Sequence, residues 1–327
     1  MEENNQYSRL TPLMMVHLAA PHTWPGASVL PPIFAAIFSM MNEYEFSLPI
    51  FTLLLACSVL AQSAVNTLND WSDYRKGTDT VENSDDPTDA VLVYDNPNPK
   101  SVLALGISFM VLCAICGLAA TWWSGSVIPI LIGIIGALAI VCYSSGKLPI
   151  SYLPLGEVVS GVIMGCFIPL AVIVIFASHS LEAGAFGLFG AWDIWEWLFA
   201  ILCTAPFVLG IGLTNATQNN CDIERDKEAG RKTLPVLLGR NKSRIVYRIF
   251  IVFWIATSLH FSFNLAGITG LWVAVICILF GLPSICKLLT LPLTPDVRGA
   301  GMGAIVKANL FINGAYILAL IYLLIQV

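Results

Sequence analysis

Residues 101–141, SVLALGISFMVLCAICGLAATWWSGSVIPILIGIIGALAIV, contain no Asp, Glu, Lys or Arg. A helix of about 20 apolar residues crosses the hydrocarbon core of a bilayer. The stretch is therefore long enough for two membrane-spanning helices, which we place at 101–122 and 127–144. Residues 158–180 form a third run without these four residue types. Such runs predict an integral membrane protein.

The composition of the whole chain supports this class. Of its 327 residues, 57% are apolar and only 11% are charged, whereas a soluble globular protein carries about 25% charged residues. The net charge of −5 comes with no basic tract. We therefore expect a lipid bilayer and not a nucleic acid as the partner. The nine cysteines are scattered and odd in number, which does not indicate a disulfide framework.

The apolar runs predict an all-α, polytopic bundle of nine membrane helices. We place them near 12–40, 47–68, 101–122, 127–144, 155–177, 196–217, 245–264, 267–288 and 303–326. The first is interrupted by four prolines, so it is either a kinked span or a short interfacial piece followed by a span. The chain is interpreted as one domain, 1–327.

The distribution of Lys and Arg predicts the orientation of the bundle. If the N-terminus is cytoplasmic, the inside segments and the helix ends beside them hold all 16 basic residues. The outside loops then hold none, as the positive-inside rule requires. The expected location is the cell membrane, multi-pass, with the N-terminus in the cytoplasm.

An acidic segment closes the second predicted helix. Its sequence is NTLNDWSDYRKGTD, residues 66–79. Asn66, Asp70 and Asp73 follow i, i+4, i+7 spacing and so share one helical face. Asn69 and Asp79 belong to the same segment.

A matching segment closes the sixth predicted helix. Its sequence is QNNCDIERDKEAGRKTL, residues 218–234. Asn219, Asp222 and Asp226 follow i, i+3, i+7 spacing and are also expected to share a face. The two helices are four spans apart, so both segments emerge on the cytoplasmic side. We call residues 66–79 the first motif and residues 218–234 the second motif.

The residue types in the two motifs predict a magnesium–diphosphate site. Carboxylates crowded at helix C-termini are disfavoured by the helix dipole and by one another. Mg²⁺ prefers such hard oxygen ligands and is often shared with substrate phosphates. Basic residues directly follow the acids and are placed to meet phosphate oxygens: they are Arg75, Lys76, Arg231 and Lys232. A single Asp-rich loop would more simply be a solvated loop, but two matched ones on one face favour a site.

These motifs resemble those of the UbiA superfamily of intramembrane prenyltransferases, over essentially the whole chain. The branch that looks most similar is the 1,4-dihydroxy-2-naphthoate polyprenyltransferases of menaquinone synthesis. The matching segments are Pro21-His22-Thr23-Trp24-Pro25, the first motif from Asn69 to Asp79, Leu155-Gly156-Glu157, and the second motif from Asp222 to Leu234. Two departures are Ala20 and Cys221, at positions where the branch commonly carries other residues.

The resemblance implies an enzyme that moves a polyprenyl group from its diphosphate to an aromatic acceptor, with Mg²⁺ as the cofactor. It implies that Asp70, Asp73, Asp222 and Asp226 hold the metal. Amides would complete or orient the metal shell: Asn66, Asn69 and Asn219. Basic residues would neutralise the leaving diphosphate: Arg75, Lys76, Arg231 and Lys232.

Four further residues are weaker candidates for the same site. Asp79 ends the first motif. Glu157 is an intramembrane carboxylate, a kind of group that is usually functional, and it could bind the acceptor, transfer a proton or make a structural bond. Lys147 and His22 could contact phosphate and acceptor respectively, although anchoring by the positive-inside rule and simple packing also explain them.

Several alternatives remain open on the sequence. The acceptor could instead be 4-hydroxybenzoate, haem or a lipid glycerol backbone. A transporter with cation-binding Asp clusters is a different class, but transporters place their sites near the bilayer midplane, whereas these acids lie at helix ends. The prenyl chain length and the oligomeric state are not indicated.

Overall fold

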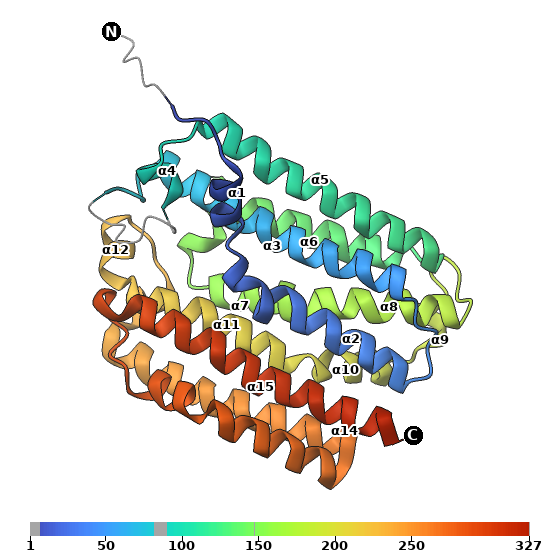
Figure 1. Cartoon of the computed structure of the whole chain (residues 1–327). Coiled ribbons are helices and arrows are strands. Elements are labelled where there is room, and N and C mark those ends of the chain that lie inside the picture. Colours follow the sequence, from blue (N-terminus) through green and yellow to red (C-terminus); the bar gives the residue numbers. More distant parts are fainter. Residues whose placement is uncertain (1–6, 82–89, 147, 327) are drawn as a thin grey trace.

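The computed structural model describes residues 7–81, 90–146 and 148–326, and all its regular elements are helices. Most of the long helices run roughly along one direction and form an elongated bundle (Figure 1). Its main helices are α2 (Leu30–Met41), α3 (Leu48–Lys76), α5 (Pro99–Ser124), α6 (Ile128–Ser144), α8 (Ile168–Ser180), α11 (Ala205–Cys221), α14 (Arg240–Thr290) and α15 (Arg298–Gln326).

Two of the spans are broken, and one long helix consists of two helices joined at a turn. The first consists of α1 (Pro12–Ala19), a short 3-10 turn and α2, and its two parts are bent by 67° around the proline-rich segment. The span made of α10 (Ile194–Cys203) and α11 is bent by 43°. Within α14 the chain turns at Gly267, whose φ of 65° and ψ of −162° are not helical. A positive φ suits glycine because it has no Cβ to clash.

The helices agree with a polytopic membrane protein. Five are long and apolar enough to cross a membrane, and seven spans result if each bent pair counts as one. The shorter α6 is apolar over its 17 residues, and Gly267 divides α14 into two helices. Counted in this way, the described residues supply the nine helical segments that the sequence predicts. The predicted all-α membrane fold is confirmed.

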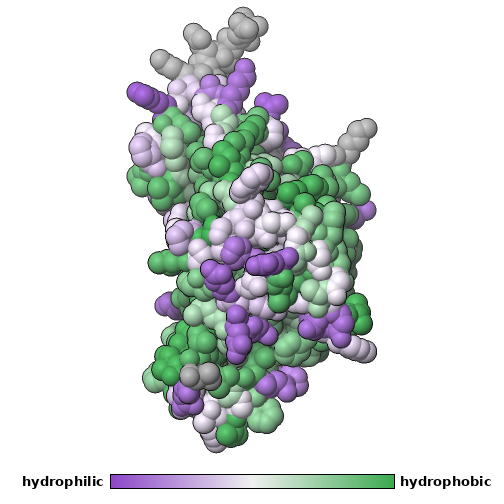
Figure 2. Space-filling view, turned by 90° about the vertical axis from the view of Figure 1, so that its right-hand side faces the viewer, coloured by the Kyte–Doolittle hydropathy of each residue, from purple (hydrophilic) through white to green (hydrophobic). Residues whose placement is uncertain are grey.

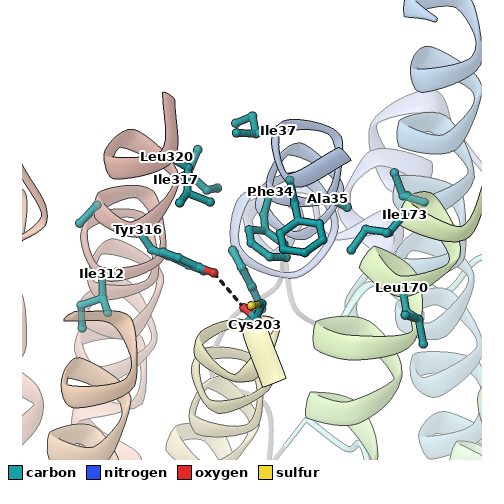
Figure 3. Packing of buried hydrophobic residues seen from close by; sticks show 14 of the residues in the cluster. Phe34, Ala35, Ile37, Leu170, Ile173, Cys203, Ile312, Tyr316, Ile317 and Leu320 are labelled. Carbon is teal, nitrogen blue, oxygen red and sulfur yellow. Dashed lines mark hydrogen bonds between the residues drawn. The ribbon is translucent and has the colours of Figure 1, made fainter. Parts of the chain in front are cut away.

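Aromatic side chains from several spans meet in the core of the bundle (Figure 3). The ring centroid of Phe34 on α2 lies 5.0 Å from that of Phe207 on α11 and 5.2 Å from that of Tyr316 on α15. The buried Tyr316 hydroxyl donates to the carbonyl of Cys203 at 3.2 Å. This contact satisfies a polar group that would otherwise be costly in an apolar interior, and it joins the bend between α10 and α11 to α15.

The two ends of the bundle differ in charge. The end that carries α4 (Val91–Tyr94) and α12 (Ile223–Glu228) also carries both motifs (Figure 1); we call it the motif end. The opposite end bears α9 (Leu188–Ala191), and Figure 2 shows polar side chains gathered in the middle of that face. Its exposed charged residues are acids: Glu43, Glu45, Glu182, Asp193 and Glu196. The described Lys and Arg residues lie at or toward the motif end, as the predicted charge partition requires.

Candidate active site

The first motif lies on α3, which runs eight residues beyond the predicted end at 68 and stops at Lys76. Gly77 ends the helix with a φ of 71°. This left-handed C-cap is the usual helix stop, and glycine adopts it without strain. The polar residues of the motif therefore extend the helix past the apolar run that predicted it. Within it, Asn69 donates to Asp73 at 3.3 Å and its own side-chain oxygen accepts a hydrogen bond from Ser144 at 2.9 Å.

The second motif is not one continuous helix. α11 ends at Cys221, Asp222 is its C-cap with a φ of −97° and a ψ of 17°, and α12 begins at the next residue. The predicted shared helical face is therefore wrong beyond Cys221, because Asn219 lies on α11 and Asp226 on α12. The break redirects the chain so that Asp226, 2% exposed, turns into the protein.

Arg231 connects the two motifs. Its Nη2 atom donates to Asp73 Oδ2 at 2.5 Å, and its Nη1 atom lies 3.5 Å from Asp226 Oδ1. The other Asp226 oxygen accepts a hydrogen bond from Thr233 at 3.0 Å. One guanidinium thus lies within reach of a carboxylate from each motif. The prediction that the two segments meet on one side of the bundle agrees with this geometry.

Two further arginines pair with one more acid from each motif. Arg225 donates to Asp79. Arg298, which begins α15, lies 3.2 Å from Asp222. Neither was among the predicted site residues. Arg225 lies inside the second motif and is an evident omission, whereas Arg298 is 76 residues from its partner and no sequence signal links the two.

Burial shapes the electrostatics of the carboxylates. It raises the pKa of Asp226 to about 6, although Arg231 and the hydrogen bond from Thr233 oppose the rise. It also raises the pKa of Asp79 to about 6, against the opposing effect of Arg225. Burial would lower the pKa of Arg231, but Asp73 and Asp226 raise it above its ordinary value. Cations near these acids therefore favour their ionised forms, as a divalent metal would.

A second polar cluster lies deeper, between α11 and α7 (Gly156–Val162). The buried Glu157 accepts a hydrogen bond from Asn219 at 2.8 Å through Oε1. Its Oε2 atom is buried and has no hydrogen-bond partner among the described residues. One turn along α11, Asn215 donates to the Tyr143 hydroxyl at 2.8 Å. The carboxylate of Glu157 therefore keeps one acceptor oxygen available.

Other predicted residues lie at the edge of this cluster or outside it. Asn66 donates to Ala19 and Thr23 at 3.1 and 3.2 Å, so it ties the first span to α3. Arg75 is exposed and, five residues after Asp70, points about 140° away from it around the helix. Lys232 and His22 are exposed, Asp70 is partly buried on α3, and Lys147 lies outside the described residues.

The donors at the motif end suit Mg²⁺. Across residues 7–81, 90–146 and 148–326, no three His, Cys, Asp or Glu side chains are grouped so that they could hold a metal ion by themselves. Mg²⁺ does not need such a cage, because it commonly binds one or two carboxylates, several waters and substrate phosphates. Asp73 and Asp226 supply carboxylates of this kind, already turned toward a common cation, and Asn69 adds an amide beside them.

The sequence and the fold are both similar to known proteins. The profile of the UbiA prenyltransferase family matches residues 29–296. The 1,4-dihydroxy-2-naphthoate octaprenyltransferase of Bacillus subtilis (strain 168) is 30% identical over 68% of this chain and 65% of its own length. UbiA prenyltransferase domain-containing protein 1 of Mus musculus is 29% identical over 65% of this chain and 60% of its own length. The chain thus spans slightly less than two thirds of these relatives.

Solved structures share the fold. A UbiA homologue from Archaeoglobus fulgidus, bound to GPP and Mg²⁺, superposes with a TM-score of 0.58 at 18% identity, over 94% of this chain and 99% of that chain. A structure described as digeranylgeranylglyceryl phosphate synthase gives 0.57 at 19% identity, over 96% of this chain and 98% of that one. At such identities the likeness concerns the fold alone.

Proposed function

The chain belongs to the UbiA prenyltransferase family, and from this premise we propose that it transfers a polyprenyl group from a polyprenyl diphosphate to 1,4-dihydroxy-2-naphthoate, in menaquinone biosynthesis. The observation that carries the proposal is the bridge of Arg231 between Asp73 and Asp226. The bridge brings one acid of each motif together at the motif end of the apolar bundle. A diphosphate bound there would contact cations, while its prenyl tail would lie among the apolar helices.

The chain's own residues account for binding of the diphosphate end. Asp70, Asp73, Asp222 and Asp226 are the proposed metal ligands, and bound Mg²⁺ supplies positive charge that stabilises the leaving diphosphate. Arg231 adds a guanidinium that can form two parallel hydrogen bonds with phosphate oxygens. Stabilising charge where it develops favours heterolysis of the allylic C–O bond. The diphosphate leaves with the bonding electrons, and the electron-rich ring of the acceptor attacks the prenyl cation.

The apolar bundle has two roles in this proposal. It accommodates the prenyl chain, and it excludes water that would otherwise capture the cation. The acceptor ring loses a proton when the new C–C bond has formed. The buried Oε2 atom of Glu157 has no hydrogen-bond partner among the described residues, which supports a proposed contact with an acceptor hydroxyl near α7 and α11.

The acceptor is proposed from the Bacillus subtilis relative, which carries that activity in its name. Other members of the family use different acceptors, so the test must compare them. The purified protein in nanodiscs is incubated with radiolabelled polyprenyl diphosphate, Mg²⁺ and one acceptor at a time: 1,4-dihydroxy-2-naphthoate, 4-hydroxybenzoate, haem or a glycerol phosphate lipid. We expect a lipophilic labelled product with the naphthoate only, and none with EDTA.

Substitutions test the assignment of the metal ligands independently of the assignment of the acceptor. Asp70→Ala and Asp222→Ala should each lower turnover at least about 100-fold, because each removes several kcal/mol of charge stabilisation. Glu45→Gln at the opposite end is the control and should be neutral. Product from another acceptor would overturn the naphthoate assignment alone. Absence of both product and Mg²⁺-dependent prenyl diphosphate binding, together with cation-driven uptake into vesicles, would favour a transporter.

A further inference from the structure

Tyr152 lies in the connection between α6 and α7, in the short 3-10 helix Ile150–Tyr152. Its ring contacts one cation from each motif. Lys76 Nζ lies over the ring, 5.0 Å from its centroid, and Arg231 Cζ lies at the same distance. Cations within about 6 Å of an aromatic centroid are attracted by the electron density of the ring face. The ring thus gathers the basic groups of two segments far apart in the chain.

Both ends of Tyr152 are fixed. Its hydroxyl is 3.3 Å from Thr78 Oγ1, just after α3. Its backbone carbonyl accepts a hydrogen bond from the backbone of Lys232 at 2.8 Å. These two contacts tie the residue to the first and the second motif respectively. The ring is therefore positioned by the same segments whose cations it contacts.

Arg231 in particular needs the contact with the Tyr152 ring to stay in position when its carboxylate partners bind a metal. Arg231 holds Asp73 and Asp226 through its two terminal nitrogens, and its buried Nε atom has no hydrogen-bond partner among the described residues. If these carboxylates serve a metal, the guanidinium loses much of that ion pairing. Holding a long side chain that has lost its ion pairs costs up to about 2 kcal/mol of rotamer entropy, so a further contact is needed to keep it in place. A ring face can hold it without competing for the phosphate, because it uses none of the N–H donors in the guanidinium plane.

We propose that Tyr152 is a positioning residue whose ring holds Lys76 and Arg231 at the diphosphate end of the substrate. The inference rests on the proposed function, which supplies the diphosphate. Lys76 is held on its other side by the Ser144 carbonyl at 2.7 Å, so the ring completes its placement. Tyr152 orients the two groups that neutralise the leaving diphosphate and does not itself touch the reacting atoms.

The test measures binding of the diphosphate end and does not depend on turnover. Wild type, Tyr152→Phe and Tyr152→Leu are reconstituted in nanodiscs, and binding of a non-hydrolysable prenyl diphosphate analogue is measured with Mg²⁺ present. Tyr152→Leu removes both cation–ring contacts and should raise the Kd about tenfold. Tyr152→Phe keeps the ring and should stay within about threefold of wild type. Tyr322→Leu, near the C-terminus of α15, controls for loss of a tyrosine elsewhere.

A second comparison separates positioning from general structural support. In a Lys76→Met background one of the two cations is already gone, so Tyr152→Leu should weaken binding less than it does in the wild type. In turnover assays the single Tyr152→Leu variant should show a raised KM for the prenyl diphosphate and an unchanged KM for the acceptor. Equal effects in both backgrounds, or a Tyr152→Phe variant as weak as Tyr152→Leu, would overturn the proposal. Wild-type protein that binds no analogue would instead refute the proposed function.

Discussion

Arg231 donates to Asp73 at 2.5 Å although 158 residues separate them in the chain. Both side chains are nearly buried, with 13% of the arginine and 6% of the aspartate exposed. The pair therefore joins the C-terminal end of α3 to the segment after α12 where little water screens the charges. It joins the two motifs into one structural unit, so a substitution in one motif should change the stability contributed by the other.

A double-mutant cycle tests that coupling. Asp73→Asn and Arg231→Gln each leave a buried charge without its main partner, so each should lower the free energy of unfolding by about 3 kcal/mol. The double variant removes both of these charges. It still leaves Asp226 without its arginine, as the single Arg231→Gln variant does, so it should cost less than the sum, by about 1–3 kcal/mol. The measurement is detergent-solubilised thermal unfolding in EDTA. Strictly additive losses would show that the two residues contribute independently.

The fold was predictable because its signal is strong and repeated. Apolar runs without charge admit little besides membrane helices, and Lys and Arg mark one set of helix ends. The boundaries were less certain at polar ends. α3 runs on to Lys76 and ends at Gly77, nine residues past the predicted end at 68, where glycine adopts the left-handed cap without strain.

The candidate site was predictable in outline only. Matched acidic segments indicated which helix ends come together, but the partners of the acids are set by tertiary packing. Arg298 reaches Asp222 from the start of α15, and Tyr152 reaches Lys76 and Arg231 from a loop. Nothing in their local sequence marks either residue. Closeness in sequence also does not fix direction: Arg75 is exposed and, five residues after Asp70, points about 140° away from it around the helix, so its predicted contact with phosphate stays a prediction.

Close packing of α11 against the helix that carries Glu157 depends on Gly165. A Cβ at this position would lie 2.5 Å from the backbone nitrogen of Val208, and backbone cannot give way as a flexible side chain can. Gly165→Ala should therefore lower the free energy of unfolding by about 1–3 kcal/mol and reduce activity by displacing Glu157 from Asn219. The measurement is thermal unfolding in detergent beside the prenyl transfer assay.

Gly133 on α6 supplies the matched control for this substitution. A Cβ there would meet nothing within 4 Å. Gly133→Ala should be neutral or stabilise the helix by up to about 1 kcal/mol. If both alanine variants behave alike, close backbone packing is not what Gly165 provides.

The orientation in the membrane is open to a labelling test. The basic motif end should face the cytoplasm by the positive-inside rule. Glu182→Cys, at the acidic end, should react with a membrane-impermeant maleimide in intact cells, whereas Lys242→Cys at the start of α14 should react only after lysis. The unsubstituted chain is the control, because it measures the labelling that comes from its native cysteines. The reverse pattern would invert the predicted topology.

Glu157 provides the most direct test of where the acceptor binds. Its Oε1 atom is occupied by Asn219, while Oε2 is buried without a partner among the described residues. Glu157→Gln preserves size and can still accept from Asn219, but it presents an N–H group in place of the second oxygen. A hydroxyl donor then loses a hydrogen bond to a charged acceptor, so the KM for the naphthoate should rise about tenfold or more.

Binding of the prenyl diphosphate distinguishes this role from a structural one. With Glu157→Gln it should stay within about twofold of wild type, since the amide keeps the bond to Asn219 and the second motif undisturbed. Glu157→Leu removes that bond as well and should weaken both substrates. If Glu157→Gln weakened the diphosphate and left the naphthoate unchanged, Glu157 would act through Asn219 on the diphosphate end, and the acceptor would have to be sought elsewhere in the bundle.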